Sequence, residues 1–148
     1  MAKYRFRLAT LQKLRETRRD EHRSALAEAF QAEQVLADHR QALTAEQAEL
    51  RDLQRAAAAE HYLDVNRLLE ATRYELVLRA NQQELSRQQE LLAVEVERRR
   101  LALVEADREV RTLELLDERH RQQHDQRQQR LEEKLLDEAA SLQHVRQR

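Results

Sequence analysis

No glycine or proline interrupts this chain of 148 residues. Because these two residues end or break most helices, their absence predicts very long helices. The absence of glycine also excludes phosphate-binding loops, and the absence of cysteine excludes disulfides and thiolate metal sites. Charged residues make up 37% of the chain and aromatic residues 3%, which leaves too little bulky apolar material for a globular core. We therefore predict an all-α fold built from a coiled coil, and an enzyme is the least favoured class.

Apolar residues recur along both halves of the chain with the spacing of a coiled-coil seam. In the N-terminal half, one heptad position holds Leu8, Ala29, Leu36, Leu43, Leu50 and Ala57, and a second holds Leu11, Ala25, Ala32 and Leu53. In the C-terminal half, the seam consists of Leu92, Val96, Arg99, Leu103, Ala106, Val110 and Leu113. We predict one elongated domain over residues 1–148, a long antiparallel two-helix coiled-coil hairpin with a short helical tip.

A polar run interrupts each seam, RETRRDEHR at residues 15–23 and DERHRQQHDQRQQR at 117–130. If the two runs face each other, the numbers of facing residues add to about 143, so that polar residues meet polar residues. The alternative is a tight turn near Asp64 with a sum of about 125, which presses the first run against LALVEADREV and leaves the last twenty or so residues unpaired. We favour the first register, because burying Arg15 and Arg18 against leucines without partners would cost several kcal/mol.

The favoured register divides the chain into a first arm at about 4–60, a tip at about 61–83 and a second arm at about 84–146. The tip is longer than a turn requires, so we expect one short helix in it, capped by Asp64. Its apolar side chains either pack within the tip or form an exposed patch for a partner. These side chains are Tyr62, Leu69, Tyr74 and Val77.

Charge is unevenly distributed along a chain whose net charge is −1. Residues 1–23 hold eight basic residues against three acidic ones, a net +5, whereas residues 24–60 hold three basic against seven acidic, a net −4. A basic end on a nearly neutral chain favours an acidic protein surface as the partner over nucleic acid. No apolar run has the length of a membrane span and no signal peptide is visible, so we expect a cytoplasmic protein without direct membrane insertion.

Two polar clusters suggest other chemistries. His120 and His124 share a helix face, and His22 could approach them from the other arm, but no further ligand is forced into place. We therefore interpret the histidines as polar seam residues and predict no metal and no cofactor. The basic run at 98–100 lies among Glu95, Glu97 and Glu105, which favours a self-paired solvated face over a phosphate-binding one.

Motifs at both ends of the chain resemble one known family. Phe6-Arg7-Leu8, followed by Leu11, Leu14, Arg15 and Glu16, resembles the start of the FliJ family, the flagellar type III export stalk proteins. A second set of residues resembles the C-terminal signature of that family. It consists of Leu113-Glu114 with Leu116, Glu118 and Arg119, followed by Glu133-Lys134 with Leu136-Asp137-Glu138. With the length and the predicted hairpin, the resemblance spans essentially the whole chain.

The resemblance implies a non-enzymatic protein that lies in the pore of a hexameric export ATPase, promotes ring assembly and couples the ring to the membrane export gate and to export chaperones. It also implies a bacterial protein peripheral to the inner membrane at the flagellar export apparatus, and we expect the free chain to be monomeric. The ATPase-binding candidates are Arg7, Arg15, Arg18 and Arg19. The candidates for binding the cytoplasmic domain of the gate are Tyr62, Leu69, Tyr74 and Val77. Two alternatives stay open, a scaffold coiled coil that forms a parallel dimer and, behind it, a nucleic-acid-binding helical hairpin.

Overall fold

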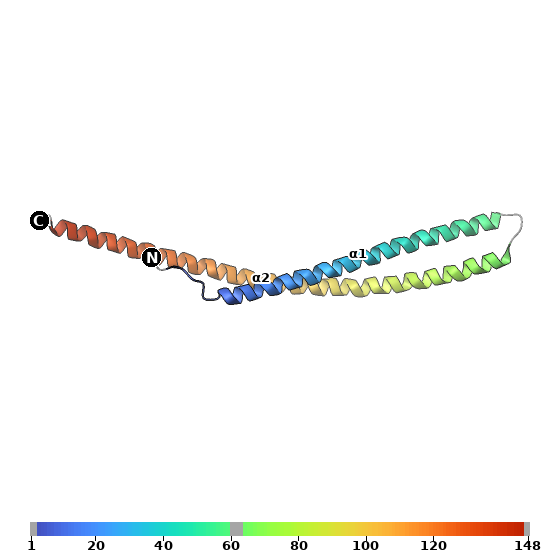
Figure 1. Cartoon of the computed structure of the whole chain (residues 1–148), viewed down its shortest axis with the longest axis horizontal. Coiled ribbons are helices and arrows are strands. Elements are labelled where there is room, and N and C mark those ends of the chain that lie inside the picture. Colours follow the sequence, from blue (N-terminus) through green and yellow to red (C-terminus); the bar gives the residue numbers. More distant parts are fainter. Residues whose placement is uncertain (1–2, 60–63, 147–148) are drawn as a thin grey trace. The chain divides into compact units, whose positions relative to one another are not determined.

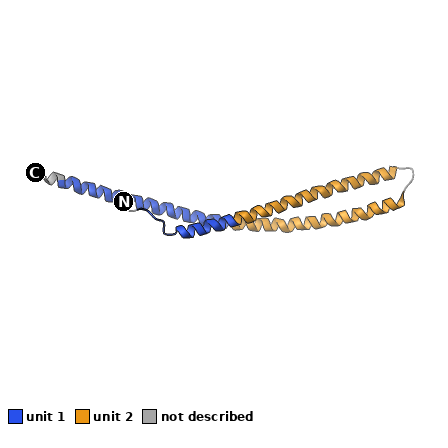
Figure 2. Cartoon of the chain, viewed as in Figure 1, with its two compact units in different colours: residues 1–21, 103–148 blue, residues 22–102 orange. Residues whose placement is uncertain are grey.

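A computed structural model describes residues 3–59 and 64–146 and shows two helices, α1 at Ala9–Ala59 and α2 at Val65–Arg146 (Figure 1). No strand occurs within these described residues. The predicted all-α helical hairpin is therefore confirmed. Contacts divide the chain into two compact units, one of residues 1–21 with 103–148 and one of residues 22–102 (Figure 2). We call them unit 1 and unit 2, and in each of them a part of α1 packs antiparallel to a part of α2.

The predicted tip at 61–83 is wrong, because α2 begins at Val65 and continues without a break. Asp64 is a helix cap, as expected, but it caps α2 itself. Its Oδ1 accepts hydrogen bonds from the backbone N–H groups of Asn66, at 3.1 Å, and Arg67, at 3.4 Å. Once the helix is started, no glycine or proline is present to stop it, so residues 65–83 join the second arm. Tyr62 lies outside the described residues.

The first helix begins at Ala9 and not at Tyr4, as the first-arm boundary of about 4–60 would have it. Residues 3–8 form a non-helical segment before α1 (Figure 1). The order of these residues is Lys-Tyr-Arg-Phe-Arg-Leu. It alternates basic and apolar side chains with a period of two, which does not favour a helix. Phe6 is buried, with 8% of its surface exposed, so the segment is anchored by its alternate apolar side chains.

The favoured register is also wrong, and the alternative is the one observed. In unit 1, Arg15 pairs with Glu109, and their numbers add to 124. In unit 2, the Gln47 side chain donates a hydrogen bond of 3.1 Å to Gln82, a sum of 129. Both pairs match the sum of about 125 that a tight turn near Asp64 requires.

The expected cost of this register is avoided because the segment facing the first polar run offers acidic partners. Residues 101–110 include Asp107 and Glu109, which meet Arg19 and Arg15 at the edge of the helix pair. Arg18 points outward and is exposed. Long arginine stems cover the seam while their guanidinium groups reach acids and solvent, so no charged residue is fully buried in the described part of the chain.

The core is thin. Buried residues of α1 lie at one heptad position, Ala29, Leu43 and Leu50, as the first seam predicted. In unit 2, Leu43 and Leu50 pack with Leu78, which is 2% exposed. The total surface is 12858 Å², against about 8,000 Å² expected for a globular monomer of this mass. Helix propensity and pairs within one helix therefore carry much of the stability.

Candidate interaction surfaces

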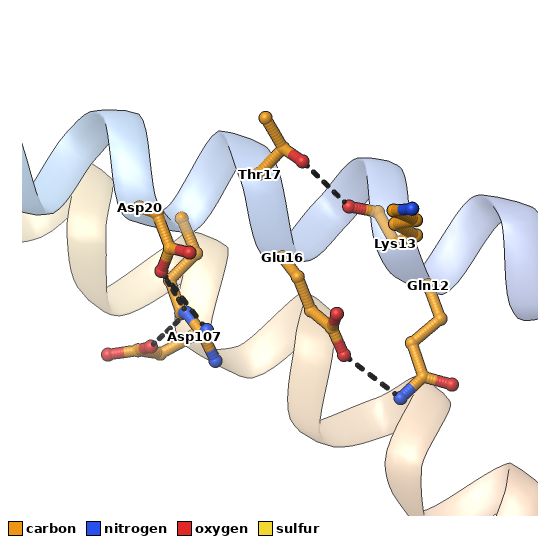
Figure 3. A network of polar contacts seen from close by, with 7 residues as sticks. Gln12, Lys13, Glu16, Thr17, Asp20 and Asp107 are labelled. Atoms are coloured by element: carbon orange, nitrogen blue, oxygen red, sulfur yellow. Dashed lines mark hydrogen bonds and ion pairs between the residues drawn. The ribbon is translucent and has the colours of Figure 1, made fainter.

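The four ATPase-binding candidates fall into two pairs with different environments. Arg15 donates a hydrogen bond of 2.8 Å to the Glu109 carboxylate on α2, and both side chains are about one-third exposed. Arg19 contacts Asp20 at 3.1 Å and Asp107 at 3.9 Å, so that one acid from each helix approaches the same guanidinium (Figure 3). Each of these two arginines thus makes a contact between α1 and α2.

Arg7 and Arg18 form the second pair. Both are exposed, and neither makes an ion pair with another residue of the described ranges. Arg7 lies in the turn before α1, and Arg18 lies on the exposed side of α1. Both lie in unit 1, so the unit presents cationic groups that its own acids do not neutralise.

His120 and His124, the two histidines that share a helix face, pack against the N-terminal aromatic residues. The Phe6 and His120 rings lie 6.1 Å apart, and the Tyr4 and His124 rings 5.6 Å apart. The Tyr4 hydroxyl donates a hydrogen bond of 2.8 Å to the Asp117 carboxylate, and burial together with this bond raises the pKa of Tyr4. Within the described residues, no group of three or more His, Cys, Asp or Glu side chains could hold a metal.

The gate-binding candidates do not form one surface. Tyr74 lines an apolar groove of about 370 Å³ between the ends of α1 and α2 in unit 2, and its hydroxyl donates a hydrogen bond to Glu46. That bond raises the pKa of Tyr74. The groove is lined mainly by apolar side chains, those of Leu50, Leu53, Ala57, Leu68 and Ala71.

Leu69 and Val77 do not line this groove and are each 52% exposed. Leu69 shares the outer face of α2 with Val65, which is 62% exposed, and Leu76, which is 60% exposed. Their spacing of four and seven residues places these three side chains on one helix face. Sequence reasoning missed Val65 and Leu76, although the same spacing marks them in the sequence.

The basic run at 98–100 is self-paired, as interpreted from its neighbours. Arg98 and Arg99 both contact the Glu95 carboxylate at 2.7 Å, and Arg100 lies 3.6 Å from Glu97. Hydrogen bonds from Arg98 and Arg99 lower the pKa of Glu95 to about 2. Arg99 also donates to a backbone carbonyl of α1, so this cluster links the two helices of unit 2.

Comparison with known proteins gives one result that decides the family. The flagellar FliJ protein family matches residues 4–148. The chain belongs to this family. The FliJ match confirms the resemblance drawn from the terminal motifs and associates the chain with the flagellar export apparatus. Neither the curated proteins nor the solved structures contain a match. Within the described residues, neither helix has a stretch apolar enough to span a membrane.

Proposed function

We propose that this FliJ-family protein is the non-enzymatic central stalk of the flagellar type III export ATPase. It promotes assembly of the hexameric ring, links the ring to the cytoplasmic domain of the export gate, and serves the export chaperones. The family match over residues 4–148 supports this role. So does the pairing of two helices, since a stiff helix pair has no six-fold symmetry and can bias one subunit of a ring at a time.

The proposed ATPase contact rests on a difference in ion pairing among the four arginines. Arg15 and Arg19 are committed to acids of the same chain, whereas Arg7 and Arg18 are free to meet acidic groups of a partner. Removing Arg15 or Arg19 would disturb the helix pair as well as any interface. Arg7 and Arg18 are therefore the sharper probes of a contact in the pore.

The gate contact is proposed at the start of α2, where Leu69, Tyr74 and Val77 lie, with Tyr62 as a further candidate. Val65 and Leu76 extend the exposed apolar stripe around Leu69. Exposed apolar side chains aligned on one helix face fit a hydrophobic partner surface.

One experiment tests both contacts, with each variant serving as the control for the other. The Arg7→Glu/Arg18→Glu variant should lose stimulation of the export ATPase but retain binding to the gate's cytoplasmic domain. The Leu69→Glu/Leu76→Glu variant should show the reverse. Both changes are at exposed side chains, so circular dichroism should report unchanged helical content. If each variant keeps both activities, the proposed sites are wrong.

The parallel-dimer scaffold finds less support in this fold. The seam residues Leu43, Leu50 and Leu78 are buried by contacts within one chain, so they offer no free seam to a second copy along the full length. We expect light scattering with sedimentation to show that the free protein is a monomer. A dimer that does not depend on protein concentration would favour the scaffold.

A further inference from the structure

The non-helical segment before α1 alternates two kinds of side chain. Its apolar side chains, Tyr4 and Phe6, contact α2 at His124 and His120. Its basic side chains are Lys3, Arg5 and Arg7, and Arg7 lies in the turn in which the Ala9 N–H donates to the Phe6 carbonyl. All three basic side chains line one groove, and we call them the basic row.

This row borders a groove of about 510 Å³ between the segment and α2. His120, His124 and Arg127 line its other side, and none of the side chains that line it is acidic. Lys3, Arg5, Arg7 and Arg127 make no ion pair with any described residue. The groove thus gathers four cations without neutralising them.

Two of the acids close to the groove in sequence, Asp117 and Asp125, already have other contacts. Asp117 accepts the hydrogen bond of the Tyr4 hydroxyl and lies 3.9 Å from Arg121, and Asp125 lies 3.3 Å from the Nδ1 atom of His124. They are therefore not available to the row on the extended segment. A ligand that neutralises this row must bring its own negative charges.

The first part of the segment, residues 3–5, also has an unpaired backbone within the described residues. No N–H or C=O group of Lys3, Tyr4 or Arg5 makes a hydrogen bond to another residue in the ranges the structure describes. An exposed extended backbone can accept a second extended chain through main-chain hydrogen bonds, with side chains of alternate residues giving specificity.

We propose that this groove binds an acidic peptide segment of a partner protein in an extended conformation. The peptide pairs along residues 3–5 and places carboxylates beside Lys3, Arg5 and Arg7, with Arg127 closing the far side. Arg7 belongs both to this groove and to the ATPase contact proposed above, whereas Lys3, Arg5 and Arg127 belong to the groove alone.

Single-stranded nucleic acid fits the groove less well. Such ligands are held by aromatic faces on which bases stack, in addition to a basic groove. The one aromatic side chain of the lining outside the histidines is Tyr4. Its ring already contacts the His124 ring, at 5.6 Å between centroids, and the guanidinium of Arg121, 5.8 Å from the Tyr4 centroid.

The test is fluorescence anisotropy of the full chain with a labelled peptide of alternating glutamate and threonine. We expect binding that weakens at least tenfold in the Lys3→Glu/Arg5→Glu/Arg7→Glu variant. Arg51→Glu/Arg73→Glu/Arg87→Glu is the matched control, because it changes the same number of exposed basic residues in unit 2. The control should bind the peptide like the unchanged protein.

Two comparisons keep the proposal open to refutation. A peptide with the same glutamates in one uninterrupted block, and an oligothymidine of equal charge, should each bind at least tenfold more weakly than the alternating peptide. Equal binding of either would overturn the extended acidic peptide as the ligand. Arg127→Glu changes α2 and leaves the extended segment intact, so unaltered peptide affinity in this variant, with helical content preserved, would contradict the groove.

Discussion

The register of α1 against α2 can be tested directly, because the two registers considered place the same residues far apart. In the observed register, Gln47 faces a position near residue 78, about four residues or 6 Å along the axis from Gln82. With helix axes about 10 Å apart, spin labels at 47 and 82 are attached to backbone points separated by about 12 Å. In the rejected register, the axial offset rises to about 21 Å and the separation to about 23 Å.

Spin labels at Gln47 and Glu97 form the control pair, because for them the observed register predicts the longer distance and the rejected register the shorter one. The observed register offsets Glu97 by about 19 residues, or 28 Å, from the position that faces Gln47, whereas the rejected register places the two side by side. The chain has no cysteine, so Gln47→Cys with Gln82→Cys, or with Glu97→Cys, directs the labels to the chosen sites. Electron paramagnetic resonance should show strong dipolar broadening for the first pair and none for the second. Broadening in the second pair alone would refute the register.

Two further predictions concern stability in unit 2. Leu78→Ala should lower the free energy of unfolding by about 2–4 kcal/mol in chemical denaturation, because Leu78 is 2% exposed. Leu76→Ala, at a position 60% exposed, should change it by less than about 0.5 kcal/mol, and equal losses would refute the core assignment. Arg98 and Arg99 lower the pKa of Glu95 from 4.5 to about 2. The contribution of ionised Glu95 to the free energy of unfolding is therefore present above pH 4.5 and is lost as the pH falls through 2. The advantage in Tm of the unchanged protein over Glu95→Gln should shrink across this window, and an advantage independent of pH would contradict the linkage.

Much of the architecture could be predicted because it follows from local chemistry. The absence of glycine and proline predicted long helices, and the heptad spacing predicted that Leu43 and Leu50 would be buried. The cap at Asp64 followed from the tendency of a short carboxylate to accept bonds from the first N–H groups of a helix. Each of these properties depends on a few neighbouring residues.

The register could not be predicted by the same reasoning, because it depends on pairs far apart in sequence, such as Arg15 with Glu109. Matching polar runs treated an arginine as a residue that must avoid an apolar seam. Arginine has a long apolar stem, so it can cover leucines and still reach an acid at the edge.

The extended segment was missed for a different reason. The order Lys-Tyr-Arg-Phe-Arg-Leu has a period of two, but it adjoins a strong helical pattern, and the helix was extended over it. The side of the candidate groove that the N-terminal segment contributes therefore rests on a period-two signal that is present in the sequence.

The arginines of unit 1 show how one residue type can serve both the fold and a partner. Arg15 and Arg19 contact acids on α2 and help to fix the register, so their loss should first loosen the helix pair. Arg7 and Arg18 have no such acid in the described chain, and desolvating them at an interface requires acids from elsewhere. A variant of the first pair that loses function should therefore also lose stability, whereas a variant of the second pair should lose function alone. This difference in stability separates a residue that builds the surface from one that makes the contact.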